Sequence, residues 1–192
     1  MKKVYSVLAI LILICGNILL RNDFLPFMKW WFAIFYLGII FMPLTSWIFD
    51  SFHDKGYLFS KAIGLAVSGY ITWLMASLHI MKFTAINCII SMIICLIFNL
   101  LLIWLKKRYT KVSLRQSLRK MLAENFDIML GEEVIFLALF LLFSYIRGFK
   151  PEAYGTEKFM DYGFMTSMLR SEYMPPQDFW YSGTSLNYYY MG

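Results

Sequence analysis

The sequence predicts an all-α membrane protein that crosses the bilayer about five times. Hydrophobic residues make up 60% of its 192 residues and charged residues only 16%, whereas a soluble domain is about half apolar and a quarter charged. The apolar residues also form unbroken runs rather than an amphipathic pattern. In lipid the backbone must satisfy its own hydrogen bonds, so such runs form transmembrane helices.

Five apolar runs are expected to be transmembrane helices. No Asp, Glu, Lys or Arg lies deep inside the first four, so these runs show no charged ion or proton route. The fifth run is shorter than the roughly 20 residues that a crossing requires. The runs are Val4–Leu20, Trp30–Phe49, Ala62–Met81, Phe83–Leu105 and Val134–Ile146.

Basic residues predict the orientation of the chain. Seven Lys and Arg residues fall between Lys106 and Lys120, and Lys2 and Lys3 precede the first run. Basic residues favour the cytoplasmic side, so we expect a multi-pass cell-membrane protein with a cytoplasmic N-terminus and a non-cytoplasmic segment 150–192. The basic cluster between Lys106 and Lys120, which contributes to the net charge of +6, then faces lipid headgroups. No motif indicates nucleic-acid binding.

The chain is expected to have four regions. Residues 1–105 form a four-helix transmembrane region, residues 106–133 a basic cytoplasmic segment, residues 134–149 the fifth helix, and residues 150–192 an acidic and aromatic segment. Within the basic segment, Leu114–Met129 is predicted to be an amphipathic helix, either on the membrane surface or packed on the other helices. A new apolar run begins at the end of the sequence, so we expect the N-terminal portion of a longer protein.

The acidic segment holds the residues that could carry chemistry. A helix is predicted over Thr156–Ser171, with Glu157 and Asp161 one turn apart on one face. Two such carboxylates can provide a general base and its orienting partner, or bind a divalent cation. Arg170 can meet a phosphate charge. The alternative is structural, because acidic residues near a helix N-terminus also favour the helix dipole.

Short motifs occur in a fixed order along the chain. They are Gly56-Tyr57, Ser60-Lys61, Gly64-Leu65, Tyr70, Trp73-Leu74 and Phe83-Thr84, followed by Glu132-Glu133, Pro151-Glu152, Glu157-Lys158-Phe159-Met160-Asp161, Pro175-Pro176-Gln177-Asp178-Phe179-Trp180 and Asn187-Tyr188-Tyr189-Tyr190. From about Lys29 onward this order resembles the "YYY" domain membrane proteins, which take their name from the tyrosine triplet. That family has no assigned biochemical role and is grouped by similarity with the GT-C class of membrane glycosyltransferases.

The resemblance implies an enzyme that takes a sugar from a polyprenyl-phosphate carrier on the non-cytoplasmic side. It implies catalytic roles for Glu157 and Asp161, with the metal requirement left open. One departure is Phe179, which stands where family members tend to have proline. The substrate-binding residues that it implies are Asp178, Arg170, Trp180, Asn187, Tyr188 and Tyr189.

Two other functions are compatible with the same residues. A non-catalytic scaffold or assembly module would use the helices as an anchor and the acidic segment as a contact surface. A transporter would need polar or broken helices near the bilayer midplane, for which Pro43 and the scattered asparagines give weak support.

Overall fold

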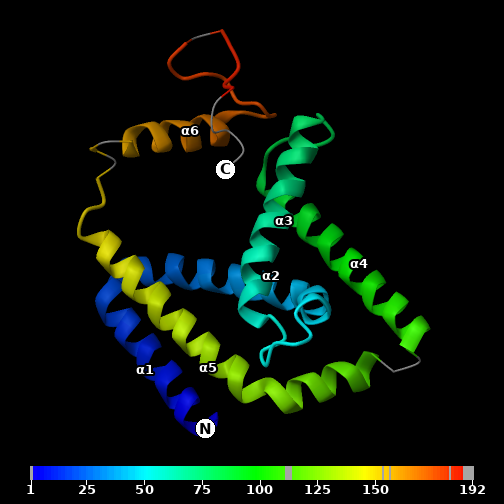
Figure 1. Cartoon of the computed structure of the whole chain (residues 1–192). Coiled ribbons are helices and arrows are strands. Elements are labelled where there is room, and N and C mark those ends of the chain that lie inside the picture. The colour runs from blue at the N-terminus through cyan, green and yellow to red at the C-terminus, as the bar shows by residue number, and fades with distance from the viewer. Residues whose placement is uncertain (1, 111–113, 153, 156, 182, 188–192) are drawn as a thin grey trace. The chain divides into compact units, whose positions relative to one another are not determined.

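The computed structural model describes residues 2–110, 114–152, 154–155, 157–181 and 183–187 (Figure 1). Over these residues the secondary structure is helical, with one isolated bridge between Gln177 and Ser185. The predicted all-α class is therefore confirmed. The elements are α1 (Lys2–Leu20), the 3-10 turn η1 (Arg21–Asp23), α2 (Phe24–Ile48), α3 (Tyr57–Ser77), α4 (Ala85–Thr110), α5 (Leu114–Gly148) and α6 (Lys158–Arg170).

Three helical stretches in the described part of the chain are long and apolar enough to cross a membrane. They are Lys2–Ile48, Tyr57–Ser77 and Ala85–Leu105. The first contains 47 residues, about twice the length of one crossing, and η1 divides it into α1 and α2. The membrane class is confirmed in this way, whereas a count of five crossings stays a prediction.

The α5 helix joins two elements that the sequence analysis treats separately. It runs without a break from Leu114 to Gly148, so the amphipathic stretch and the fifth apolar run form one helix. No proline interrupts this stretch, and Gly131 has a packing role instead of ending a helix. A Cβ on Gly131 would lie 3.1 Å from the Tyr5 ring of α1.

The described helices form two compact units. Unit 1 contains Met1–Leu65 and Leu96–Pro151, and unit 2 contains Ala66–Cys95 and Glu152–Gly192. The long helices α3 and α4 each contribute to both units.

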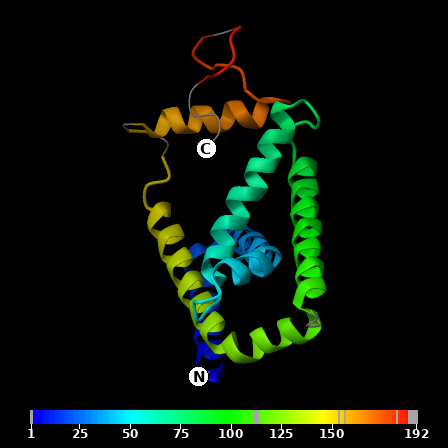
Figure 2. The ribbon, with the colours of Figure 1, turned by 45° about the vertical axis from the view of Figure 1, so that its right-hand side comes forward.

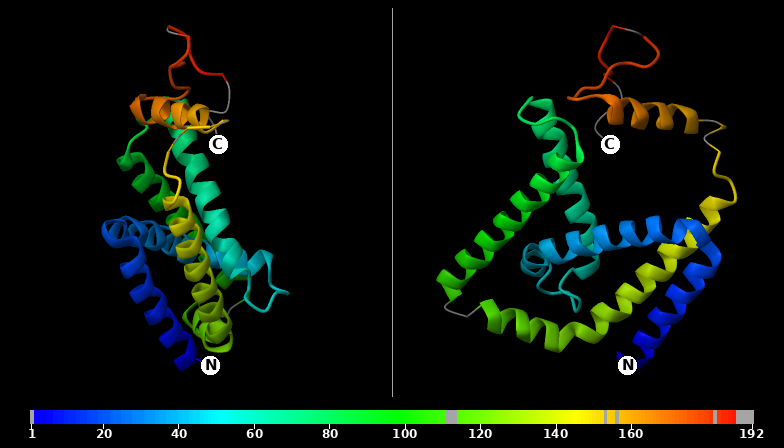
Figure 3. Two further views of the ribbon diagram at one scale, coloured as in Figure 1. Left: turned by 90° about the vertical axis from the view of Figure 1, so that its left-hand side faces the viewer. Right: turned by 180° about the vertical axis from the view of Figure 1, so that it is seen from behind.

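In unit 1, α1 and α5 pack side by side in the same direction (Figure 3). Near the N-terminal end of α1, the Lys2 Nζ atom lies 3.7 Å from the Asp127 Oδ1 atom of α5. Further along, Gly16 of α1 meets Leu141 of α5, where an added Cβ would lie 3.3 Å from the leucine side chain. The contacts thus follow the same order along the two helices, from Lys2 and Asp127 to Gly16 and Leu141, so α1 and α5 pack in parallel.

The α2 and α3 helices approach each other closely because glycines face the contact. A Cβ on Gly38 of α2 would lie 3.0 Å from the Lys61 side chain. A Cβ on Gly64 of α3 would lie 3.1 Å from the backbone carbonyl oxygen of Leu37. Small residues at such contacts are the usual means by which membrane helices pack backbone to backbone.

In unit 2, the ends of α3 and α4 pack in opposite directions on either side of their connecting loop (Figure 2). The Asn87 amide nitrogen donates to the Thr72 carbonyl at 3.0 Å, and Asn87 is fully buried. This asparagine is a helix-to-helix partner, as expected for uncharged polar residues inside membrane helices.

We predict that Gly64→Ala destabilises the protein and that Gly69→Ala does not. The new methyl at position 64 meets the backbone of Leu37, which cannot move aside, whereas the space around Gly69 is open. Overpacking costs about 1–3 kcal/mol and exceeds the gain of up to about 1 kcal/mol in helix propensity. Thermal unfolding in detergent measures both variants, and equal midpoints would contradict the close α2–α3 contact.

Candidate functional site

The two carboxylates with predicted catalytic roles lie at the start of α6. Glu157 is the N-cap residue of this helix and Asp161 lies in its first turn. Both are exposed, and the Asp161 amide donates to the Glu157 carbonyl at 3.0 Å. Both residues therefore lie at the N-terminal end of α6, while Thr156 lies outside the described residues. Across the described part of the chain, no group of three or more His, Cys, Asp or Glu could hold a metal ion.

A cleft of about 520 Å³ opens at the other end of α6. Arg170, in the last turn of the helix, and Asp178, after the Pro175-Pro176 pair, both line it. The cleft thus offers a guanidinium, carboxylates, hydroxyls and two aromatic rings. Its lining comprises Thr166, Ser167, Arg170, Ser171, Glu172, Tyr173, Pro175, Gln177, Asp178 and Phe179.

Helix geometry separates the carboxylate pair from this cleft. A helix advances about 1.5 Å and turns about 100° per residue. Asp161 and Arg170 are thus about 14 Å apart along α6 and on opposite sides of it. The structure does not bring Glu157 and Asp161 into one site with Arg170, and their catalytic role stays a prediction.

The remaining predicted binding residues surround the turn that follows the cleft. The Asp178 Oδ1 atom accepts the backbone N–H groups of Trp180 at 2.8 Å and Tyr181 at 3.0 Å. The exposed Trp180 ring packs edge-on against Phe164, with centroids 5.9 Å apart. Asn187 is exposed, and Tyr188 and Tyr189 lie outside the described residues.

The α3–α4 loop holds one wall of the cleft in place. The Phe83 amide donates to the Glu172 carbonyl at 2.7 Å, and the Lys82 ammonium donates to the Glu172 carboxylate at 2.8 Å. The His79 ring stacks on the Tyr173 ring, with centroids 4.6 Å apart and planes 20° apart. Two residues that line the cleft, Glu172 and Tyr173, are therefore positioned by the loop.

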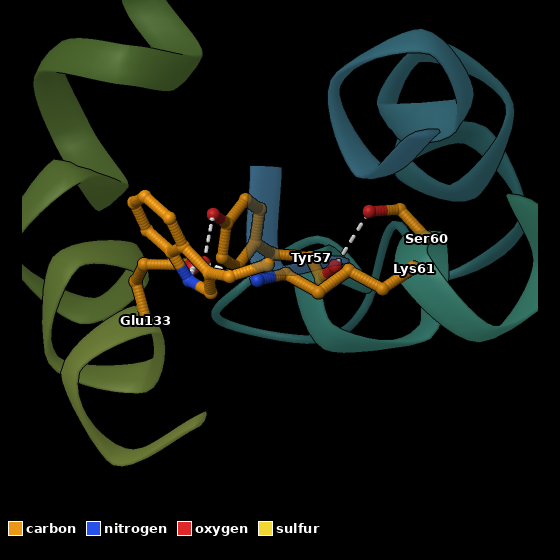
Figure 4. Close-up of polar contacts among 5 residues, drawn as sticks. Tyr57, Ser60, Lys61 and Glu133 are labelled. Atoms are coloured by element: carbon orange, nitrogen blue, oxygen red, sulfur yellow. Dashed lines mark hydrogen bonds and ion pairs between the residues drawn. The ribbon is translucent and has the colours of Figure 1, made fainter. Parts of the chain in front are cut away.

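Unit 1 contains a second polar cluster, which the sequence analysis did not identify. Glu133 of α5 is its centre (Figure 4). Its Oε1 atom accepts the Trp31 indole N–H at 2.8 Å, and its Oε2 atom accepts the Tyr57 hydroxyl at 2.6 Å. The Lys61 ammonium donates to the same Oε2 atom. One carboxylate therefore joins α2, α3 and α5.

Aromatic rings surround the charged pair. The Lys61 ammonium lies 4.1 Å from the Phe136 ring centroid and 5.2 Å from the Tyr57 ring centroid. The side chain of Lys61 is only 4% exposed and that of Glu133 12%. The ammonium is thus balanced by one carboxylate and by ring faces, which attract cations.

The cluster was missed because of where the helix begins. The third apolar run of the sequence starts at Ala62 and leaves Lys61 outside, whereas α3 begins at Tyr57 and includes the lysine. Glu133 was likewise placed just before the fifth run. The sequence signal that could have found the pair is an ionisable residue of each sign at the edge of an apolar run.

The bonding of the cluster indicates a structural role. Glu133 accepts three hydrogen bonds, and the charge of Lys61 is neutralised within the protein. A buried pair of this kind fixes the helices that carry it, and removal of one partner leaves an uncompensated charge.

A family model described as "Uncharacterized membrane protein (DUF2298)" matches residues 67–192. The chain belongs to the DUF2298 family. The matched range starts well after Lys29, where the sequence resemblance was expected to begin. No curated protein and no solved structure matches the chain.

The cleft and the buried cluster differ in how much of each lies within the residues that the DUF2298 model matches. All residues that line the cleft lie within residues 67–192. In the buried cluster only Glu133 lies within that range, and Trp31, Tyr57 and Lys61 precede it. The cleft therefore lies wholly within the matched range, whereas most of the buried cluster lies before it.

We predict that Tyr57→Phe destabilises this DUF2298 protein by about 1.5–3 kcal/mol, because a hydrogen bond to a charged group is lost. Tyr36→Phe is the matched control, since Tyr36 is 57% exposed on α2 and such changes stay within about 0.5 kcal/mol. Thermal unfolding in detergent measures both variants. Equal midpoints would contradict the role assigned to the Tyr57 hydroxyl.

We predict that Lys82→Gln loosens the wall of the cleft at neutral pH. The hydrogen bond and charge of Glu172 raise the pKa of the Lys82 ammonium above its ordinary value. The ion pair is therefore present in full below that ordinary value, and it is lost only as the pH rises through the raised pKa.

Hydrogen exchange of the amides in segment 170–178 tests this prediction. At neutral pH the segment should exchange faster in Lys82→Gln, by a modest factor because the pair is exposed. Lys55→Gln, which removes an exposed ion pair with Asp50 in unit 1, should leave the segment unchanged. Unaltered exchange in Lys82→Gln would show that the ion pair does not hold the wall.

Proposed function

We propose that this chain is the N-terminal part of a GT-C-like membrane glycosyltransferase that uses a polyprenyl-phosphate-linked sugar on the non-cytoplasmic side. The observation that carries the proposal is the cleft, in which Arg170, Asp178 and the Tyr173 ring share one lining. Guanidinium groups suit phosphate, and aromatic rings provide flat apolar faces. The likeness to GT-C enzymes itself rests on the order of the sequence motifs.

In this proposal Arg170 binds the phosphate of the donor. A carboxylate accepts the proton of an acceptor hydroxyl, whose oxygen attacks the anomeric carbon of the sugar. The bond between that carbon and the phosphate oxygen breaks, and the polyprenyl phosphate leaves with its new charge beside Arg170.

The geometry and the resemblance favour different carboxylates as the base. Asp178 lines the cleft together with Arg170, so in this arrangement we assign the proton-accepting role to Asp178. The resemblance favours Glu157 and Asp161, which lie at the other end of α6. A role for these two residues requires the substrate to extend around α6. Trp180 and Asn187, with Tyr188 and Tyr189, remain proposed substrate contacts on the resemblance alone.

The proposed orientation places residues 150–192 outside and the N-terminus in the cytoplasm. The parallel packing of α1 and α5 supports the placement of the N-terminus and residues 150–192 on opposite sides, because the first and fifth crossings of a membrane run in the same direction. The basic residues around Lys106–Lys120 then face the cytoplasmic leaflet, as the positive-inside rule expects.

A transfer assay with the full-length protein tests the function. The protein is supplied with a polyprenyl-phosphate sugar, and released polyprenyl phosphate is measured. We predict that Arg170→Gln lowers kcat/KM by about 10-fold to 100-fold, because a charged hydrogen bond to phosphate is lost. Arg108→Gln, an exposed arginine beside Trp104 on α4, is the matched control. A wild-type protein without transfer activity on such donors would contradict the proposal.

The same assay decides between the carboxylates. Loss of a general base lowers kcat by about 10²-fold to 10⁴-fold. We predict this loss for Asp178→Asn, which keeps an oxygen to accept the N–H groups of Trp180 and Tyr181. The double variant of Glu157→Gln and Asp161→Asn should lose as much only if the resemblance assigns the base correctly. Full activity in Asp178→Asn would remove Asp178 from the mechanism.

A non-catalytic membrane scaffold is the second candidate, and one observation favours it. Glu157 and Asp161 are exposed at the N-terminal end of α6, where carboxylates stabilise a helix without any chemistry. Under this function their substitution would weaken folding or partner binding. Loss of turnover in a variant with unchanged thermal stability would argue against a scaffold.

A further inference from the structure

Unit 1 has a cavity of its own, of about 440 Å³, between the α1–α2 turn and the end of α5. Figure 3 shows this turn beside the last turns of α5. Phe27, which lines the cavity, also belongs to the core cluster with Leu137 and Leu141. The volume falls within the range of ordinary small-molecule sites, about 300–1,000 Å³.

The walls of the cavity are apolar and largely aromatic. They include Leu20, Phe27, Trp30, Phe140 and Phe149. Trp30 is 63% exposed and Phe149 72% exposed. Large aromatic side chains at the ends of membrane helices are typical of the interface between hydrocarbon and headgroups. An acyl chain therefore fits these walls.

The rim of the cavity carries one carboxylate, and two arginines lie next to lining residues along the chain. Asp23 lines the cavity, and Arg21 belongs to the same 3-10 turn. On the opposite side, Arg147 lies in the last turn of α5, between the lining residues Tyr145 and Gly148. Both arginines are exposed. A ligand headgroup at this rim would meet the Asp23 carboxylate, while Arg21 and Arg147 are sequence neighbours of lining residues. The Arg147 guanidinium also donates to the Lys150 carbonyl.

We propose that this cavity binds a phospholipid with an ethanolamine headgroup. The lipid ammonium donates to the Asp23 carboxylate, the phosphate contacts Arg21 and Arg147, and one acyl chain lies along the aromatic walls. A primary ammonium has three N–H donors, whereas the choline headgroup has none. A phosphatidylglycerol headgroup has a negative phosphate and no ammonium, so it leaves Asp23 without a cation.

The test is lipid retention by the full chain. The protein is placed in nanodiscs with equal amounts of phosphatidylethanolamine, phosphatidylcholine and phosphatidylglycerol. It is then extracted, and retained lipids are counted by native mass spectrometry. We expect about fivefold or greater retention of phosphatidylethanolamine over each of the other lipids, as one charge-assisted hydrogen bond would give. Equal retention, or a preference for phosphatidylglycerol, would overturn the proposal.

Three variants locate the binding to this cavity. Asp23→Asn should remove the preference for phosphatidylethanolamine, and Arg147→Gln should lower its retention. Gly148→Leu should displace the lipid, because the space around its Cβ is open and the new side chain fills it. Gly69→Leu is the matched control, as it too has open space on a helix.

The folding of each variant is verified by thermal unfolding in detergent. If Asp23→Asn does not fold, the retention of phosphatidylethanolamine by Gly148→Leu is sufficient to test the site. Undiminished phosphatidylethanolamine retention in Gly148→Leu would show that the lipid binds elsewhere and would contradict the site. The inference does not depend on transferase activity.

Discussion

Unit 1 depends on the hydrogen bonds and the ion pair of the Glu133 carboxylate. This carboxylate accepts hydrogen bonds from Trp31 of α2 and from Tyr57 and Lys61 of α3. A buried charge is costly without a partner and well-directed hydrogen bonds, and here three donors meet one acidic group. The glycines at the α2–α3 contact let the backbones approach closely enough to form this geometry. The charged pair thus gives specificity to helices that are otherwise apolar.

Much of the fold could be predicted from the sequence because apolar runs of helical length have few alternatives in lipid. Each of the five predicted runs overlaps one of the helices α1 to α5, and the acidic helix is α6. Three runs were drawn too long, because α2 ends at Ile48, α3 ends at Ser77 and α4 begins at Ala85. The continuity of α5 was not predictable, because the charged residues around Glu132 divide its apolar pattern. The Lys61–Glu133 pair was missed since its two residues are 72 positions apart, and only the tertiary packing brings them together.

The acidic and aromatic segment 150–192 shows a different limit of prediction from sequence. The one-turn spacing of Glu157 and Asp161 predicted a shared helix face, and the structure places Glu157 at the N-cap of α6 and Asp161 in its first turn. The spacing could not predict the cleft, which forms where the chain turns back after Pro175 and Pro176. Arg170 lines that cleft from the opposite end of α6. Local periodicity therefore gave the carboxylate pair, whereas the grouping around Arg170 depends on the path of the loop.

A double-mutant cycle on Lys61 and Glu133 tests the central claim most directly. The free energy of unfolding in detergent is measured for the wild-type protein, Lys61→Met, Glu133→Gln and the double variant. The account predicts a loss of about 3–5 kcal/mol for Lys61→Met, which leaves the carboxylate unpaired. It also predicts a coupling energy of at least about 1 kcal/mol between the two sites. Effects that add to within about 0.5 kcal/mol would show that the pair does not hold the helices together.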